Sequence, residues 1–272
     1  MSGLLPDGAT DTHLHVYDGR YPVSRDAIVF AANALPDEYL AIARRLGIDR
    51  AVLVQASAYG LDNRCQLAAM AAFEAAGVTS RGVMVVDSTT GIEELHRLHD
   101  LGVRGARFHM LPGGAIGWKH LVPVAELIAP LGWHIQLQLD GNQLADVLDR
   151  ITGLPCPLVV DHIGRFMPPP AVDSEAVEML LDLVDQGSTW VKLSAPYESA
   201  ADRAPDFPEV TAVVDELVRS RPDRLLWASN WPHPGQLDPL TEHDLMRLLR
   251  RWIPTELRHQ ILVSNPAAIY DF

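Results

Sequence analysis

The sequence predicts one α/β domain, residues 1–272, folded as a single (β/α)8 TIM barrel. Short β-type runs alternate with helical patterns along the whole chain, which is typical of strand–helix units around a parallel sheet. No linker or low-complexity stretch divides the 272 residues, a length that suits one large barrel. The alternative, an open doubly wound sheet, usually carries a Gly-rich phosphate turn after its first strand. Here the first strand ends in His13, Leu14 and His15 instead.

The predicted strands are short, apolar runs with polar residues at their last positions. In such a barrel the active site lies at the carboxyl ends of the strands, so these last positions hold the candidate site residues. The runs are residues 10–17, 51–57, 82–87, 105–110, 133–141, 158–164, 190–196 and 225–231.

The helical patterns between the strands have recognisable ends. Pro36 is a good first helical residue, and Asn63 and Asn142 are natural N-terminal caps. A glycine ends each pattern, as expected for a helix C-terminus. The clearest helical patterns are residues 36–47, 63–77, 90–102, 142–153 and 173–187.

Composition limits the function. The formal charge of −13 disfavours nucleic acid and anionic membrane as partners, although local arginines can still bind an anionic substrate. Neither Cys65 nor Cys156 lies in a CxxC pair, so we expect no zinc–thiolate site and no disulfide framework. The first eight residues lack a signal-peptide pattern and no apolar stretch is long enough for a bilayer, so we expect a cytoplasmic protein.

The first two strand ends carry His13, His15, Gln55 and Ser57. A spacing of two points both histidines to one face, where they can bind a metal or polarise a carbonyl. The alternative is one structural and one exposed histidine. Gln55 and Ser57 can donate hydrogen bonds to a substrate.

Strand four places Arg107 and His109 on one face. A buried arginine needs an anionic partner, which is either a substrate carboxylate or a carboxylate of the barrel. Arg104 is expected to form a structural ion pair.

Strands five and six offer two glutamines and an adjacent Asp–His pair. Gln136 and Gln138 face the mouth, whereas His134 comes too early in its strand to do so. Asp161 and His162 are adjacent and should face opposite ways. We therefore expect His162 at the mouth and Asp161 on the outside.

The last two strand ends complete the candidate set. Trp227 and Trp231 either wall the pocket or pack in the core. The polar candidates here are Lys192, Ser194, Tyr197, Glu198, Ser229, Asn230 and His233.

Together these motifs resemble the amidohydrolase superfamily, in its amidohydrolase-related (amidohydrolase 2) branch. Within that branch the chain is similar to the lactone-acting group, which contains galactaro-lactone isomerases and 2-pyrone-4,6-dicarboxylate lactonases. LPGGA (111–115), LDGN (139–142) and YES (197–199) favour the isomerases. The motifs that carry the resemblance are DTHLH (11–15), VQAS (54–57), GVRGARF (102–108), VVDHIGR (159–165), VKLS (191–194), SNWPH (229–233) and NPAAIY (265–270).

The resemblance implies a barrel whose site is lined by His13, His15 and His162, with Arg107 facing a substrate carboxylate. Many relatives bind zinc through the strand-one pair, a strand-five histidine and a strand-eight aspartate. This chain has glutamines on strand five and Asn230 on strand eight. An amide is a poor zinc ligand, so we expect no catalytic metal and no cofactor.

Asn230 also bears on the reaction. In the lactonases an aspartate at this place is taken as the base that activates water, and an amide cannot accept that proton. Ring exchange within a sugar-acid lactone needs no water, because the substrate carries its own hydroxyl nucleophile. We therefore expect His13, His15, His162 and Asn230 to be catalytic. The expected substrate-binding residues are Arg107, Ser57, His109, Gln138, Arg165, Tyr197, Glu198 and His233.

The leading hypothesis is thus a metal-independent 1,5-to-1,4 isomerase of an aldaric acid lactone that carries a carboxylate. The second is a lactone hydrolase in which His233 or Glu198 replaces the missing aspartate. The third is a sugar-acid-binding protein without activity, which the intact histidine set disfavours. The oligomeric state is left open.

Overall fold

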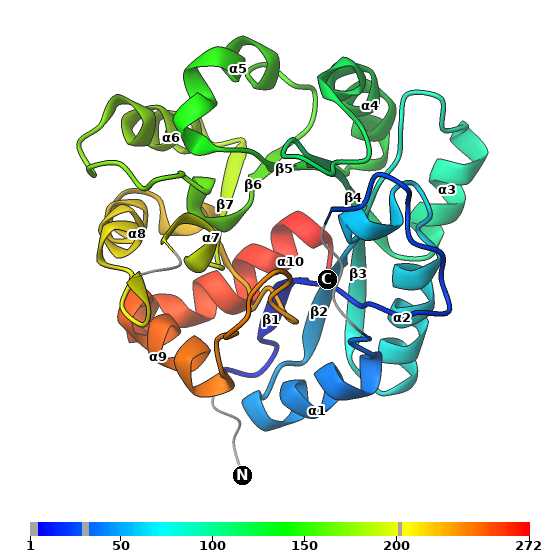
Figure 1. Ribbon diagram of the computed structural model, residues 1–272, viewed down its shortest axis with the longest axis horizontal. Coiled ribbons are helices and arrows are strands. Elements are labelled where there is room, and N and C mark those ends of the chain that lie inside the picture. Colours follow the sequence, from blue (N-terminus) through cyan, green and yellow to red (C-terminus); the bar gives the residue numbers. More distant parts are fainter. Residues whose placement is uncertain (1–4, 29–32, 201–202) are drawn as a thin grey trace.

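The computed structural model describes residues 5–28, 33–200 and 203–272, and it confirms the (β/α)8 barrel. Eight parallel strands pair in the order β1-β2-β3-β4-β5-β6-β7-β8, and helices surround them (Figure 1). The strands are β1 Thr10–Leu14, β2 Arg50–Val54, β3 Thr79–Met84, β4 Val103–His109, β5 His134–Gln138, β6 Leu158–Val160, β7 Thr189–Leu193 and β8 Leu225–Trp227.

The helices follow the predicted pattern. Pro36 opens the first of them, and Gly47 ends it at φ 80°, a conformation that glycine adopts without strain. Within the described residues the α-helices are α1 Pro36–Leu46, α2 Arg64–Ala75, α3 Ile92–Asp100, α4 Leu121–Ile128, α5 Leu144–Ile151, α6 Glu175–Asp185, α7 Tyr197–Ala200, α8 Pro208–Ser220, α9 Glu242–Trp252 and α10 Asn265–Tyr270.

Of the two predicted asparagine caps, Asn63 occupies the N-cap position of α2 but its side chain makes no capping bond, and Asn142 is not the capping residue. Asn63 precedes α2, but its side chain pairs with the backbone of Val85, donating from Nδ2 at 2.8 Å and accepting at Oδ1 at 3.0 Å. Asn142 is exposed and donates to the carbonyl of Pro168. The side chain of Asp140 instead caps the turn before α5, by accepting from the Asn142 backbone N–H. Both asparagines fix loops, a role that local sequence does not reveal.

Apolar packing forms two layers. The larger one fills the space between the outer faces of the strands and the helices. A smaller cluster lies inside the barrel, where Val52, Val159 and Leu226 pack against Ile269 and Tyr270 of α10. Helix α10 therefore closes the end of the barrel opposite the strand tips. None of the helices in the described residues is long and apolar enough to cross a membrane.

The barrel closes between β8 and β1 through the residues just beyond each strand. Leu14 and Trp231 form an isolated parallel bridge. The Asn230 N–H donates to the His13 carbonyl at 2.9 Å, and the His15 N–H donates to the Trp231 carbonyl at 2.8 Å. These bonds place the tip of β8 directly beside the histidines of β1.

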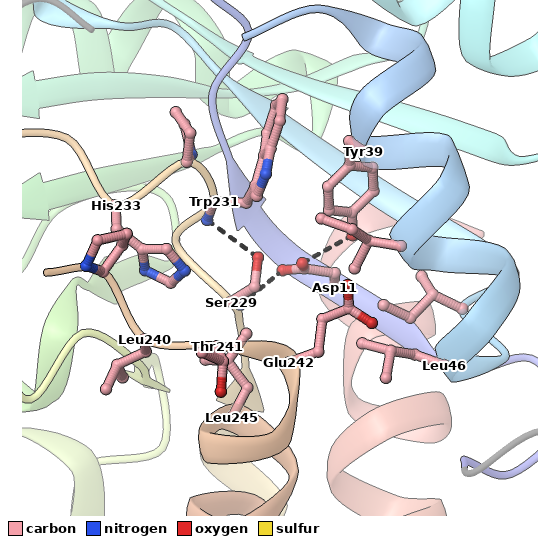
Figure 2. A pocket seen from close by; sticks show the side chains of 14 residues that line it. Asp11, Tyr39, Leu46, Ser229, Trp231, His233, Leu240, Thr241, Glu242 and Leu245 are labelled. Carbon is pink, nitrogen blue, oxygen red and sulfur yellow. Dashed lines mark hydrogen bonds between the residues drawn. The ribbon is translucent and has the colours of Figure 1, made fainter. Parts of the chain in front are cut away.

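A buried carboxylate, Asp11, reinforces this closure. Its Oδ1 accepts the backbone N–H groups of His13 and Ser229, and its Oδ2 accepts the Tyr39 hydroxyl at 2.7 Å. Figure 2 shows this network at the wall of a cavity of about 290 Å³, lined mainly by apolar side chains of α1, α9 and the loop after β8. The Trp231 side chain lines this cavity, whereas Trp227 is packed in the core.

Replacing Asp11 by Ala is expected to lower the free energy of unfolding by about 2–5 kcal/mol, because three buried donors lose their acceptor. Urea denaturation measures the change. The matched control is Asp271→Ala, which removes a carboxylate whose side chain is 79% exposed and which pairs with Arg104. The control should change stability by less than about 1 kcal/mol. Equal effects of the two variants would show that closure does not depend on Asp11.

Candidate active site

A cavity of about 180 Å³ lies at the carboxyl ends of the strands. Most predicted site residues line it, and His13 lies directly beneath. The sequence reasoning missed Tyr17, although it continues the His13–His15 alternation by one more step. The lining residues are His15, Tyr17, Ser57, Arg107, His109, Leu111, Pro112, Gln138, His162, Arg165, Glu198, Asn230 and Pro234.

His13 and His15 face each other, as their spacing predicts. Their Nε2 atoms are 3.1 Å apart. His15 Nδ1 donates to the Val54 carbonyl at 2.8 Å, so the Nε2 of neutral His15 carries a lone pair. Burial and then Arg107 lower the pKa of His15 to about 3, so His15 is neutral at neutral pH and the lone pair of its Nε2 is directed at His13 Nε2.

Asp161 lies inside the barrel, which corrects its predicted outward orientation. Its Oδ1 is 3.2 Å from His13 Nδ1, and its Oδ2 accepts from Gln136 Nε2 at 3.0 Å. Val159, two residues earlier on β6, also packs inside the barrel, so Asp161 continues that alternation and the outward assignment was wrong. The backbone then turns through positive φ at His162 and Ile163, a costly conformation that is often found at functional sites.

Lys192 supplies the counter-charge for Asp161. Its Nζ is 3.6 Å from Asp161 Oδ1 and donates to Gln136 Oε1 at 2.6 Å and to the Thr12 carbonyl at 2.8 Å. Burial lowers the pKa of Lys192 to about 8, partly opposed by Asp161, so the amine is still mostly protonated at neutral pH. Gln136 is thus used within the barrel and does not line the cavity.

Arg107 is a buried cation at the cavity wall and is only 4% exposed. It donates from Nη1 to the Gln55 carbonyl and from Nη2 to Gln138 Oε1 at 3.0 Å. Its Nε has no partner in the part of the chain that the structure describes. His109 Nδ1 contacts the same Gln138 oxygen at 3.0 Å.

No carboxylate of the described residues forms an ion pair with Arg107. The described ion pairs of the barrel use Asp161 for Lys192 and Glu198 for Arg165, the latter at 2.9 Å. The alternative expectation, a barrel carboxylate as the partner of Arg107, therefore finds no support in residues 5–28, 33–200 and 203–272. The predicted structural pair of Arg104 is confirmed, with Asp271 at 3.2 Å.

His162 projects into the cavity from the turn after β6. Its Nδ1 is 2.8 Å from Ser194 Oγ, and its ring centroid is 4.8 Å from that of His13. When the Ser194 hydroxyl donates to Nδ1, Nε2 carries the hydrogen and becomes a donor toward the cavity. Burial lowers the pKa of His162 well below its ordinary value.

Asn230 lines the cavity, whereas the side chains of Tyr197 and His233 lie behind it. Asn230 Nδ2 donates to the Tyr197 hydroxyl at 2.9 Å, and this hydroxyl is 2.8 Å from His233 Nδ1. Among the described residues, Asn230 Oδ1 has no hydrogen-bond partner. The structure thus brings Tyr197 and His233 to the site through Asn230, while the side chain of His233 lines the second cavity (Figure 2).

Three donors at the cavity floor are close enough to hold a metal ion, since single atoms of His13, Asp161 and His162 lie within 4.8 Å of one another. The surrounding charges oppose a dication, because Lys192 already neutralises Asp161 and the buried Arg107 adds a second positive charge. Asn230 offers a neutral amide rather than a carboxylate. This donor set fits a catalytic zinc ion poorly, and no step below passes through a metal.

Buried neutral histidines should make the fold acid-labile. Burial is the main cause that lowers the pKa values of His109 and His233 to about 4, and those of His15 and His134 to about 3. The unfolded chain binds protons at these imidazoles near pH 6.5 and the folded chain does not. Stability is therefore fully present above that pH and falls on acidification, by about 1.4 kcal/mol per pH unit for each histidine.

Urea denaturation at pH 7.5, 5.5 and 4.5 checks this expectation. His134→Leu is the informative variant, because both ring nitrogens of His134 lack partners in the described structure. This variant should reduce the slope of the unfolding free energy against pH by about 1.4 kcal/mol per pH unit, the contribution of one histidine. A stability that stays constant from pH 7.5 to 5.5 would contradict the assignment of neutral buried imidazoles.

Comparisons with known proteins show the family of the chain. The amidohydrolase family model matches residues 10–272. The chain is 34% identical to the D-galactarolactone isomerase of Agrobacterium fabrum over 98% of this chain and 92% of that protein. It is 33% identical to a 2-pyrone-4,6-dicarboxylate hydrolase of Comamonas testosteroni, over 98% and 91% of the two chains. A 4-sulfomuconolactone hydrolase of Rhizobium radiobacter is 32% identical, over 99% and 92%.

Solved structures show the same fold. An apo crystal structure of an Agrobacterium tumefaciens protein superposes with a TM-score of 0.91 at 32% identity, covering 98% of this chain and 97% of that one. A zinc-bound amidohydrolase of Burkholderia multivorans has a TM-score of 0.75 at 22% identity, covering 97% and 99% of the two chains. At that identity the likeness concerns the fold alone.

Proposed function

Because the chain belongs to the amidohydrolase family, we propose that it is a lactone isomerase acting on an aldaric acid lactone of the D-galactarolactone type, by 1,5-to-1,4 ring exchange and without a resident metal. The observation that carries the proposal is the absence of a free carboxylate at the cavity. Of the described lining residues only Glu198 is acidic, and Arg165 holds it in an ion pair. Activation of water by a carboxylate is therefore disfavoured.

Substrate binding begins with Arg107. A carboxylate of the lactone provides the anion that this buried guanidinium lacks within the described chain. Gln138 and His109 hold one another beside it and offer further polar contacts. Ser57, Tyr17 and the Arg165–Glu198 pair complete a polar rim that suits hydroxyl groups.

The reaction then needs one proton acceptor and one proton donor. A hydroxyl of the substrate attacks the lactone carbonyl carbon as its proton passes to the His13–His15 pair, whose Nε2 atoms lie 3.1 Å apart and of which His15 lines the cavity. The tetrahedral intermediate collapses when the original ring C–O bond breaks. The proton taken from the attacking hydroxyl then passes to the departing oxygen, while His162 Nε2–H stabilises the negative charge of the intermediate by a hydrogen bond. One ester bond forms and one breaks, so no water is consumed.

Proximity explains why a modest pocket suffices. The nucleophile belongs to the same molecule as the carbonyl, and well-oriented intramolecular attack has an effective molarity of about 10⁵–10⁸ M. The protein therefore needs to hold one ring conformation and transfer a proton. His13 supports this by fixing His15 from below, while Asp161 and Lys192 fix His13.

The proposal is tested with purified protein and D-galactaro-1,5-lactone, followed by ¹H NMR. The 1,4-lactone should appear first, and the open acid should accumulate no faster than in buffer. Treatment with a chelator, with metal content measured before and after, should leave the rate unchanged. Loss of activity on metal removal would contradict the metal-free chemistry.

The second candidate function is lactone hydrolysis, which the two relatives named as hydrolases favour. In that reaction the His13–His15 pair would accept the proton of a water molecule instead of that of a substrate hydroxyl. The same NMR experiment separates the two functions, because hydrolysis yields open diacid as the first product.

A further inference from the structure

We propose that Tyr197 and His233 orient the amide of Asn230 so that its oxygen, Oδ1, faces the substrate and selects a hydroxyl group there. Tyr197 and His233 are thereby positioning residues, and Asn230 is the residue that contacts the substrate hydroxyl. This deepens the proposed function and rests on it for the identity of the substrate.

Hydrogen bonds hold the backbone of Asn230 in place, so only the orientation of its side-chain amide can vary. Its N–H donates to the His13 carbonyl at 2.9 Å, and its carbonyl accepts the His233 N–H at 2.7 Å. Its φ is 58°, a left-handed conformation that asparagine tolerates better than most residues. The side chain is 1% exposed and lies at the cavity wall.

The hydroxyl of Tyr197 decides which end of the amide turns toward the cavity. This hydroxyl has one hydrogen, and it lies between His233 Nδ1 at 2.8 Å and Asn230 Nδ2 at 2.9 Å. When the hydrogen goes to His233 Nδ1, the phenolic oxygen can accept only an N–H from Asn230. The amide nitrogen then points to Tyr197, and Oδ1 points away from it.

Neutral His233 is the form that accepts the tyrosine hydrogen. Burial lowers the pKa of His233 to about 4, and its side chain borders the second cavity on the far side of the loop. Neutral His233 with its hydrogen on Nε2 keeps a lone pair on Nδ1. With Asn230 Nδ2 donating to the Tyr197 hydroxyl and this tautomer of His233 accepting the hydroxyl hydrogen, the chain of bonds runs from Asn230 through Tyr197 to His233.

The result is a buried oxygen that still needs a donor. Asn230 Oδ1 is inaccessible and has no partner in the part of the chain that the structure describes, and leaving such an oxygen unpaired is unfavourable. A substrate hydroxyl supplies the hydrogen, whereas a keto, ether or carboxylate oxygen cannot. The specificity is therefore for a hydroxylated acid, not for a flat, unsaturated dicarboxylate.

The test is a double-mutant cycle between Tyr197→Phe and Asn230→Ala, read as kcat/KM for the galactaro-lactone and as the calorimetric Kd of galactarate. We expect Tyr197→Phe to lower kcat/KM and to raise Kd, each by about tenfold, the effect of one ordinary hydrogen bond. In the Asn230→Ala background the same change should have almost no further effect, because Tyr197 acts through Asn230. Additive effects in both measurements would overturn the proposal.

Two further variants separate positioning from structural roles. His233→Asn keeps a side-chain acceptor near Nδ1 and should retain most of the activity, whereas His233→Ala should resemble Tyr197→Phe. Tyr270→Phe is the matched control, since it removes a buried tyrosine hydroxyl that does not line the cavity. It should leave both measurements unchanged.

Galactarate binding keeps the two proposals distinguishable. Wild-type protein that binds galactarate with the predicted cycle but rearranges no lactone would refute the proposed function and support the orientation of Asn230. Wild-type protein that does not bind galactarate would overturn the hydroxyl selection itself. Equal affinity for galactarate and for an unsaturated dicarboxylate such as muconate would also overturn it.

Discussion

Replacing Asn230 by Asp is expected to raise lactone hydrolysis by about 10²–10⁴-fold, the usual contribution of a positioned general base. The new carboxylate would lie at the cavity wall, beside the imidazoles of His13 and His15. It would accept a proton from water, which the amide cannot do. Ring exchange should decline at the same time, because the open acid formed by hydrolysis can no longer rearrange. Product ratios by ¹H NMR measure both reactions in one sample.

Asn230→Ala is the control for this change. It removes the amide without adding a base, so it should reduce ring exchange and leave hydrolysis at the background rate. If Asn230→Asp failed to increase hydrolysis while still binding galactarate, another group would have to be the water-activating base. His15 and Glu198 would then be the residues to replace next.

Arg107→Met is expected to lower kcat/KM by about 10²–10³-fold, because the substrate carboxylate would be buried without its cation. The effect should appear mainly in KM, since Arg107 grips the carboxylate before and during the reaction alike. Steady-state kinetics with the galactaro-lactone measure it. Stability should change little, because the loss of the hydrogen bonds from Arg107 to Gln55 and Gln138 is offset by removal of a buried cation that lacks a described ion-pair partner.

Arg104→Met is the matched control on the same strand, β4. Arg104 pairs with Asp271 away from the cavity lining, so its loss should leave kcat/KM unchanged. A similar loss of activity in both variants would mean that Arg107 acts through the strand rather than through the substrate.

Much of this site follows from the alternation of residues along parallel strands. The alternation predicts that His13 and His15 share a face and that Arg107 and His109 do so too, and the structure shows His15, Arg107 and His109 around one cavity with His13 beneath. The prediction failed at Asp161, because it gave the inward face of β6 to His162. Val159 and Asp161 share that face, and His162 reaches the cavity through a turn at positive φ. Turn conformation depends on tertiary contacts that no local pattern encodes.

The contacts between loops also could not be predicted from the sequence. Tyr197 follows β7 and Asn230 follows β8, and only the assembled barrel reveals that one bonds the other. The same holds for the Lys192–Asp161 pair, since each residue by itself looks like a costly buried charge. Strand tips predict which residues gather at the mouth. They do not predict which of these residues contact the substrate and which hold their neighbours.

The most direct test of ring exchange is the reaction of wild-type protein in H₂¹⁸O, with the products analysed by mass spectrometry. Intramolecular attack by a substrate hydroxyl predicts a 1,4-lactone that contains no ¹⁸O. Attack by water would place one ¹⁸O atom in the carboxylate of an open acid before any new ring forms. A lactone product carrying ¹⁸O, formed faster than the solvent reaction, would contradict the role assigned to Asn230.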